Sequence, residues 1–195
     1  MFQQKTQPGY TIIETMISVS LFLIIVMSGM GALLNANALH QKSQDIRSIM
    51  DNLSFITEDM SRSLRTGRNY HCGDSVGIET PKSCSAGGIL YFEEAITGVS
   101  GNAVDQWGYK IESTDGGTTF NISKTVDGGS NWVQLNPPEV VLKSFSGFGV
   151  LGAEAYSANS QQPFVIMRLI GTITTKTIVT PFSIQTSVSQ RVLDI

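Results

Sequence analysis

The chain has 195 residues, of which 41% are hydrophobic and 15% charged, and this suits one folded domain plus an anchoring helix. Its formal net charge of −3 excludes a general electrostatic attraction to nucleic acid or anionic lipid. Composition alone names no substrate.

The first element in the chain is a long apolar segment. No formally charged residue stands between Glu14 and His40, and a helix over that stretch is about 37 Å long at roughly 1.5 Å per residue. The hydrocarbon core of a bilayer is about 30 Å thick. The run Leu21–Met27 is apolar on every helical face, unlike an amphipathic surface helix. The sequence therefore predicts a helix that spans a membrane over about residues 15–36 or lies inside a bundle of its own kind.

The residues before this segment do not match a secretory signal. Such a signal has its cleavage site after the apolar core, whereas the Pro8-Gly9 break precedes the apolar core here. Cleavage after Gly9 would leave Glu14 five residues into the mature chain. Because a lone carboxylate at bilayer depth costs at least about 2.5 kcal/mol, we expect Glu14 to need a partner. The free amine of Tyr10 in a neighbouring copy is the candidate.

The stretch from Gly9 to Glu14 resembles the processing site of the type IV pilin family, which includes the pseudopilins of type II secretion systems. The family pattern is Gly, an aromatic residue, Thr, two aliphatic residues and Glu. This chain has Gly9, Tyr10, Thr11, Ile12, Ile13 and Glu14. Tyr10 stands where Phe is usual, and Lys5 is the only basic residue in a leader where several are common.

The resemblance implies a route of processing and assembly. Prepilin peptidase would remove the leader, residues 1–9, the new N-terminus at Tyr10 would be methylated, and Glu14 would guide docking into a helical filament. The expected partners are other pilin or pseudopilin subunits, the peptidase and an inner-membrane assembly platform. The expected location is the bacterial inner membrane, crossed once, with the head in the periplasm or outside the cell.

The helix is predicted to continue to residue 66, because no Pro interrupts it before Gly67. Apolar residues recur at steps of three and four, the spacing of one helix face: Ile46, Ile49 or Met50, Leu53, Ile56, Met60 and Leu64. We expect this stripe to pack beneath a sheet. The prediction is an α+β fold, with one long helix over residues 10–66 and an antiparallel β-sheet head over residues 67–195. This layout resembles minor pseudopilins of the J type and related minor pilins.

Three arginines, Arg62, Arg65 and Arg68, cluster at the end of this helix. A patch that binds DNA is one interpretation. Cations in a last helical turn also complement the helix dipole, and Glu58 and Asp59 lie just upstream. We therefore favour a solvated face and expect no nucleic-acid partner.

Cys72 and Cys84 are the only cysteines, and they enclose a loop rich in Gly, Pro and Ser. In an exported domain such a pair predicts a disulfide, and closing so short a loop contributes about 3 kcal/mol in the chain-entropy model. His71 raises zinc as an alternative, but a fourth good ligand and the spacing of known zinc motifs are lacking. We predict a disulfide and no metal.

From Gly87 onward, short β-prone runs are separated by Gly, Pro, Asn and Asp. The predicted strands are residues 89–92, 109–112, 118–124, 132–135, 140–145, 164–174 and 177–188. The last run alternates apolar and polar residues, which is typical of an antiparallel strand with one buried face. The run from Phe164 to Ile170 is apolar on nearly both sides and is predicted to be a central strand.

Two near-copies, Ser113–Phe120 and Thr125–Trp132, contain Asp-Gly-Gly and resemble the Asp-box turn of sialidase-like propellers. This tripeptide provides positive φ and a side chain that bonds its own turn. We predict two successive hairpin turns, with calcium bound by Asp115 or Asp127 as the alternative.

The run Gly147–Gly152 matches the dinucleotide-binding fingerprint. That fingerprint needs a following helix and an acidic residue about 20 positions further on. Residues 153–162 are too few and too rich in Ser and Asn for that helix. We expect the glycines to belong to a bent strand or bulge.

The sequence offers little basis for catalysis. His40 lies beside the membrane helix and His71 beside the predicted disulfide, so neither is placed to serve a nucleophile. We expect no enzyme and no cofactor. The expected function is a minor pilin or pseudopilin, a structural subunit of a type IV pilus or type II secretion filament. The alternative is a single-pass, membrane-anchored periplasmic binding or adhesion module that does not polymerise.

Overall fold

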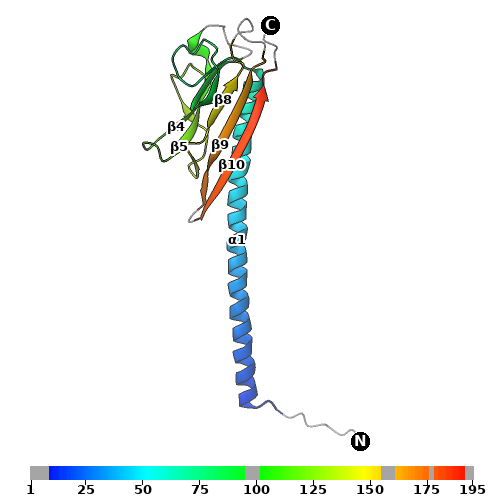
Figure 1. Ribbon diagram of the computed structural model, residues 1–195. Helices are drawn as coiled ribbons and strands as arrows, with labels where there is room; N and C mark the ends of the chain where they lie inside the picture. Colours follow the sequence, from blue (N-terminus) through cyan, green and yellow to red (C-terminus); the bar gives the residue numbers. More distant parts are fainter. Residues whose placement is uncertain (1–8, 95–101, 155–160, 176–177, 192–195) are drawn as a thin grey trace. The chain divides into compact units, whose positions relative to one another are not determined.

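The computed structural model describes residues 9–94, 102–154, 161–175 and 178–191. Its contacts divide the chain into two units, Met1–Asp45 and Ile46–Ile195. The first contains the start of a long helix, and the second contains the end of that helix with the sheet (Figure 1). Each unit is described in its own terms.

The helix α1 covers Ile12–Thr66, 55 residues without a Pro. It begins two residues later than predicted, because the Thr11 side chain and carbonyl accept hydrogen bonds from the first turn and make Thr11 the N-cap. It ends where predicted, and the amide of Gly67 still bonds the carbonyl of Ser63 at 3.0 Å. The predicted long N-terminal helix is confirmed.

The head half of α1, from Ile46 to Thr66, shows the predicted stripe. Its buried residues are Ile49, Leu53, Ile56, Met60 and Leu64, and Met50 packs against them. Met60 and Leu64 are 0% exposed, whereas Phe55 on the opposite face is 73% exposed. The stripe joins one hydrophobic core with side chains of the sheet, so an amphipathic helix packed on a sheet is confirmed.

The described part of the head contains ten strands and one short 3-10 helix, Ala103–Asp105. The strands are β1 (Arg68–Cys72), β2 (Cys84–Gly87), β3 (Ile89–Glu93), β4 (Trp107–Ser113), β5 (Phe120–Thr125), β6 (Val133–Gln134), β7 (Val140–Leu142), β8 (Gly147–Leu151), β9 (Phe164–Thr175) and β10 (Ile178–Ser189). They form one sheet in the order β1-β3-β4-β5-β7-β9-β8-β2, with β10 beside β9 and β6 beside β5. The strand pairs are all antiparallel, and the α+β fold class is confirmed.

Strand β9 is central, as predicted. Its first half pairs with β8, its second half with β7, and its whole length with β10. Val165, Met167, Leu169 and Ile173 are buried on one face, and Arg168 is exposed on the other. The second half of β10 shows the predicted alternation: Phe182, Ile184 and Thr186 are half-buried and Val188 is buried, whereas the intervening Ser and Gln residues are exposed.

Two strands were not predicted, and the segments expected as strands 132–135 and 140–145 were too long. β1 (Arg-Asn-Tyr-His-Cys) and β2 (Cys-Ser-Ala-Gly) have no β-prone alternation, whereas β8 lies in the glycine run that was expected to form a bent strand or bulge. The segment expected as strand 140–145 ends at Leu142, because Lys143 starts a turn whose carbonyl accepts from the amide of Ser146 at 2.9 Å.

Both Asp-Gly-Gly segments form the predicted hairpin turns. The first joins β4 to β5 and the second joins β5 to β6. All four glycines have positive φ, from 68° at Gly128 to 118° at Gly117. At Gly128 a Cβ would also lie 2.0 Å from the carbonyl oxygen of Ala103, so this turn accepts only glycine.

The predicted disulfide is present between Cys72 at the end of β1 and Cys84 at the start of β2. Lys82 forms an isolated β-bridge with His71. The amide of Lys82 donates a hydrogen bond to the carbonyl of Tyr70, and the carbonyl of Lys82 accepts one from the amide of Cys72. The two end strands of the sheet order, β1 and β2, are therefore joined covalently, and backbone hydrogen bonds tie β1 to Lys82, just before β2.

Candidate functional site

The N-terminal unit places the predicted processing and assembly residues at the start of α1. Gly9 and Tyr10 are outside the helix and exposed, with Tyr10 84% exposed. Thr11 caps the helix, since its Oγ1 lies 3.4 Å from the amide of Glu14. Thr11 and Glu14 have the spacing of a capping box. A cut after Gly9 would leave the whole helix and its cap intact.

Glu14 is exposed in the first turn of α1, where the helix dipole favours a negative charge. That effect is worth about 0.3–1 kcal/mol, whereas a carboxylate at bilayer depth costs about 2.5 kcal/mol or more. The dipole therefore offsets less than half of the cost. A nearby cation is still required wherever this turn is surrounded by lipid.

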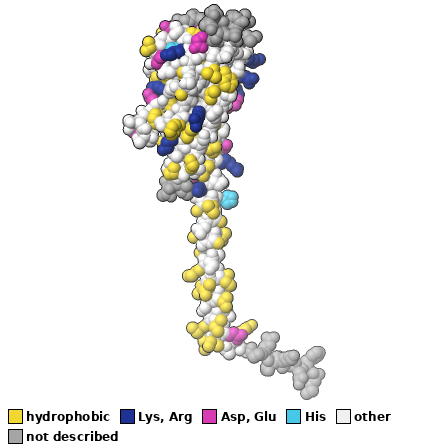
Figure 2. Space-filling model, viewed as in Figure 1, with side chains coloured by type: hydrophobic (Ala, Val, Ile, Leu, Met, Phe, Trp, Pro, Cys, Tyr) yellow, Lys and Arg dark blue, Asp and Glu magenta, His cyan; other side chains and the backbone are white. Residues whose placement is uncertain are grey.

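The apolar half of α1, from Ile12 to Leu39, is exposed along its length within its unit. The large side chains here are 41% to 82% exposed, from Val26 to Ile12. Figure 2 shows hydrophobic side chains along this stretch on the face in view. By length and composition, the helix could cross a membrane once.

Four hydroxyl side chains of the apolar half donate hydrogen bonds within the helix. The hydroxyls of Ser18, Ser20 and Ser28 donate to carbonyls four residues earlier, at 2.8–2.9 Å. Thr15 donates to the carbonyl of Ile12 at 2.8 Å. These hydroxyls therefore suit an apolar surrounding, whereas Glu14 brings a formal charge into this stretch.

The arginine cluster predicted at the end of α1 is divided by the structure. Arg68 turns into the head, where its Nε lies 3.1 Å from Oε2 of Glu93, a side chain that is 0% exposed. Arg62 and Arg65 stay on the surface and meet Arg191, which follows β10. The backbone amide of Arg191 donates to the carbonyl of Arg65 at 2.9 Å, which fixes these two residues side by side.

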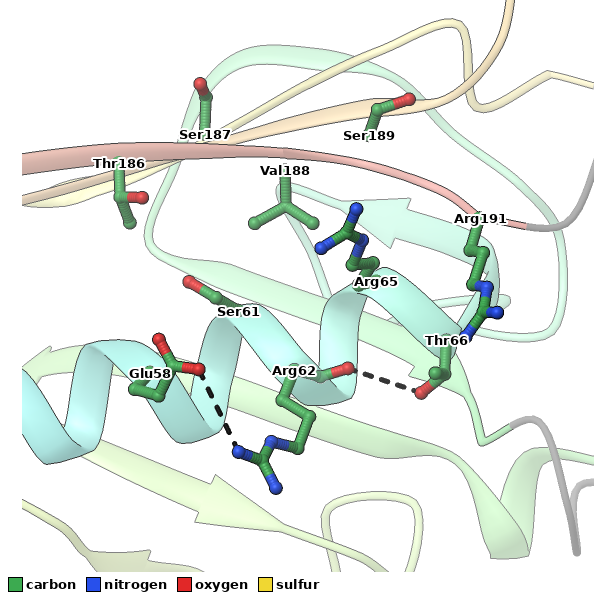
Figure 3. Close-up of a pocket in the computed structure, with 10 residues that line it drawn as sticks. All are labelled: Glu58, Ser61, Arg62, Arg65, Thr66, Thr186, Ser187, Val188, Ser189 and Arg191. Carbon is green, nitrogen blue, oxygen red and sulfur yellow. Dashed lines mark hydrogen bonds and ion pairs between the residues drawn. The ribbon is translucent and has the colours of Figure 1, made fainter.

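These three arginines line a groove of about 810 Å³ between the last turns of α1 and the end of β10, which we call the arginine groove (Figure 3). The other residues that line it are Glu58, Ser61, Thr66, Thr186, Ser187, Val188 and Ser189. Arg62 pairs with Glu58 at 3.9 Å, and both side chains are more than 70% exposed. Sequence reasoning missed Arg191, because only the fold brings the end of β10 to the end of α1.

The disulfide loop is held by a polar network. Nδ1 of His71 lies 2.7 Å from the carbonyl oxygen of Thr80, and Nε2 lies 2.9 Å from Oδ1 of Asp74. Lys82 pairs with the other oxygen of Asp74, and these two hydrogen bonds hold the pKa of Asp74 well below its usual range. Because both imidazole nitrogens and both cysteine sulfurs are engaged, this cluster serves structure. Among the described residues, no group of three or more His, Cys, Asp or Glu side chains is placed to hold a metal ion.

The carboxylates of the two hairpin turns are engaged in their own loops. Oδ1 of Asp115 accepts from the amide of Thr119 at 2.8 Å, and this lowers the pKa of Asp115 to about 2. Oδ1 of Asp127 accepts from the Thr125 hydroxyl at 2.7 Å and the Asn131 amide at 2.9 Å, and these bonds lower its pKa to about 2. The geometry accounts for both aspartates as turn residues.

The glycine run resembling a dinucleotide fingerprint is mostly strand. Gly147–Leu151 forms β8, which pairs with β9 on one side and β2 on the other. Gly149 lets the β2 backbone approach, since a Cβ there would lie 3.2 Å from the carbonyl oxygen of Ser85. The glycines serve strand packing, as expected.

A long, apolar N-terminal helix, an antiparallel sheet and a disulfide are together compatible with the layout of a pilin. Comparisons with protein-family models, with curated proteins and with solved structures found no significant match.

Proposed function

We propose that this chain is a minor pilin or pseudopilin, a structural subunit of a type IV pilus or type II secretion filament. Prepilin peptidase cleaves it after Gly9 and Tyr10 becomes the methylated N-terminus. The observation that carries the proposal is the apolar half of α1, which exposes its large side chains and holds Glu14 in its first turn. Such a surface needs lipid before assembly and other helices after it.

The energetics of Glu14 give assembly a direction. In lipid the carboxylate retains about 1.5 kcal/mol or more of unrelieved cost, after the helix dipole is counted. The free amine of a neighbouring Tyr10 removes that cost when protomers stack. Stacking therefore gains about tenfold in its equilibrium constant from this one pair.

The head supports a subunit role through its construction. The stripe of α1 is part of the head's core, and Tyr70 of β1 donates its hydroxyl to the carbonyls of Leu64 and Gly67 at the end of the helix. A subunit held in a filament by the start of α1 thus carries its head on the end of the same helix. The proposed partners are other pilin or pseudopilin subunits, the peptidase and the inner-membrane assembly platform.

The mature N-terminus tests the proposed processing. Mass spectrometry of protein purified from a host with prepilin peptidase should find methylated Tyr10 as the first residue. A Gly9→Val variant should keep its leader under the same conditions. An intact leader on the native chain, with the peptidase active on a known substrate, would contradict the proposal and favour a membrane-anchored binding module.

Substitution of Glu14 tests the proposed assembly. Glu14→Leu and Glu14→Val should fold and insert normally, because the carboxylate lies outside the head, but co-purification with other subunits should fall about tenfold. Asp51→Leu makes the same type of change on an exposed site of the head half of α1. It should leave co-purification unchanged. Equal recovery of Glu14→Leu and native chain would rule out the pairing role.

A further inference from the structure

Strand β10 pairs with a neighbouring strand along one of its edges only, in the described part of the sheet. It pairs with β9 over all twelve of its residues, and no second strand pairs with it in the described part of the sheet. A long edge strand presents a row of unpaired backbone amides and carbonyls, and proteins usually protect such an edge with charged side chains or Pro. β10 has no charged residue, and its one Pro is Pro181, near its start.

The arginine groove runs along the unprotected end of this edge. Thr186 and Val188 point toward α1, while Ser187 and Ser189 point to the other side of the strand (Figure 3). Residues from both faces of one strand can line the same groove only where the groove follows the edge of that strand. The groove is therefore open to the backbone of β10 between Thr186 and Ser189.

The charge of the groove is positive although the chain carries a net −3. Three guanidinium groups, from Arg62, Arg65 and Arg191, line it with one carboxylate, Glu58. Glu58 lies 3.9 Å from Arg62, so Arg65 and Arg191 carry the excess charge. Guanidinium groups bind carboxylates through paired, charge-assisted hydrogen bonds, and the neighbouring hydroxyls of Ser61 and Thr66 add further polar groups.

We propose that the arginine groove binds an extended, acidic segment of a partner polypeptide, which pairs with the free edge of β10 as an added strand. Backbone hydrogen bonds to β10 align the segment, and carboxylates two residues apart reach Arg65 and Arg191. This proposal concerns the head alone and holds whether or not the chain assembles through α1.

A peptide fits the groove better than a single-stranded nucleic acid does. Proteins that bind single strands stack the bases on aromatic side chains, and none of the ten residues that line the groove is aromatic. A strand edge, by contrast, recognises the backbone of an extended peptide. The arginines and the strand edge that line the groove thus favour a polypeptide with Glu or Asp at alternate positions.

Binding is tested on the full chain in detergent micelles or nanodiscs. The probe is a synthetic octapeptide that alternates glutamate with valine, labelled with a fluorophore. The controls are a lysine–valine octapeptide, the glutamate peptide with every second amide methylated, and a ten-residue oligothymidylate. The glutamate peptide should bind at least tenfold more tightly than each control, since only it offers both carboxylates and a complete strand edge.

Two variants and one structural readout locate the site. Arg65→Gln and Arg191→Gln should each weaken binding of the glutamate peptide about tenfold, whereas Arg47→Gln, an exposed arginine on α1 outside the groove, should not. Hydrogen exchange should show that amides of β10 between Thr186 and Ser189 become protected on binding. This protection is the signature of strand pairing, which ion pairing alone would not produce.

Several results would overturn the proposal. Equal binding of the glutamate and lysine peptides would show that the groove does not recognise negative charge. Full binding of the methylated peptide would show that the peptide does not pair with β10 as an added strand. Tighter binding of oligothymidylate, lost in Arg65→Gln, would assign the groove to nucleic acid. The peptide comparisons use the native chain, so they decide even if a variant fails to fold.

Discussion

The two halves of α1 belong to one continuous helix but have opposite relations to their surroundings. Between Ile12 and Leu39 the large side chains are exposed on every face, whereas from Ile49 to Leu64 one stripe is buried and the other face is polar or exposed. The difference lies in the sequence pattern. An apolar surface all round has no partner within the chain, while a stripe at steps of three and four is satisfied by the sheet.

This contrast predicts that the two halves of α1 affect different properties, the stability of the head and the contacts between copies of the chain. Side chains of the head half should determine the free energy of unfolding of the head, because they are part of its core. Side chains of the apolar half should leave that quantity unchanged and act on insertion and on contacts between copies. Substitutions of one type in the two halves can test this division.

The largest effect is expected from a matched pair of leucine truncations. Leu53, 1% exposed, is in the core, and Leu23, 50% exposed, is in the apolar half. Leu53→Ala should lower the free energy of unfolding of the head by about 3–4 kcal/mol through lost burial and a cavity. Leu23→Ala should change it by less than about 0.5 kcal/mol. Tryptophan fluorescence of Trp107 and Trp132 during urea unfolding in detergent measures both.

A similar loss from both leucines would mean that the apolar half contributes to the fold of the head. A loss from neither would mean that the stripe on α1 is not part of the cooperative core. Phe55→Ala provides a further control, because Phe55 lies on the head half but is 73% exposed.

The next effect concerns the disulfide, which acts only on the head. Replacing Cys72 and Cys84 together by Ser should lower the free energy of unfolding by about 3 kcal/mol, since the unfolded chain regains the freedom of the closed loop. Dithiothreitol should destabilise the native chain by a similar amount and leave the double variant unchanged. A response of the double variant to the reductant would show that the loss has another origin.

The smallest effect is a dependence of head stability on pH. Asp115 and Asp127 have pKa values of about 2 in the folded chain against an ordinary value of 3.8. Because folding lowers these pKa values, their contribution is fully present above about pH 4 and is lost as the pH falls toward 2. Both groups are exposed loop carboxylates, so solvent screening keeps the contribution small.

Thermal melts between pH 5 and pH 2 measure this contribution. Asp115→Asn with Asp127→Asn keeps an oxygen acceptor in each turn but removes the titration. The double variant should lose less of its melting temperature than the native chain over this interval, and it should melt slightly below the native chain at pH 7, where it lacks the contribution of the two carboxylates. Parallel curves would mean that other carboxylates, such as Asp74, account for the acid dependence.

The sequence predicts well those features of the fold that follow from the periodicity of apolar residues within one segment. The stripe on α1, the alternation in β10 and the central place of β9 depend on the order of apolar and polar residues within one segment. β1 and β2 were missed because their strand conformation depends on neighbours: β1 pairs with β3, and β2 is set by β8 and the disulfide. Gly and Ser in β2 have no β preference of their own.

The candidate sites divide in the same way. Gly9, Tyr10 and Glu14 are adjacent in sequence, so a local motif can suggest them, and the structure adds the capping role of Thr11. The arginine groove could not be predicted, because Arg191 is more than a hundred residues from Arg65 in the chain and meets it only through the end of β10. Arg68 looked like a member of the cluster but is held by buried Glu93.

The covalent tie between Cys72 and Cys84 has a mechanical consequence. Tension that passes along the backbone beyond the buried stripe of α1 reaches β1 through Gly67, and β1 is the strand that such a pull would otherwise unzip from β3. Because Cys72 is bonded to Cys84 in β2, tension beyond the bridge is shared with β8 and, through it, β9. A head built in this way resists peeling from its first strand when α1 is pulled.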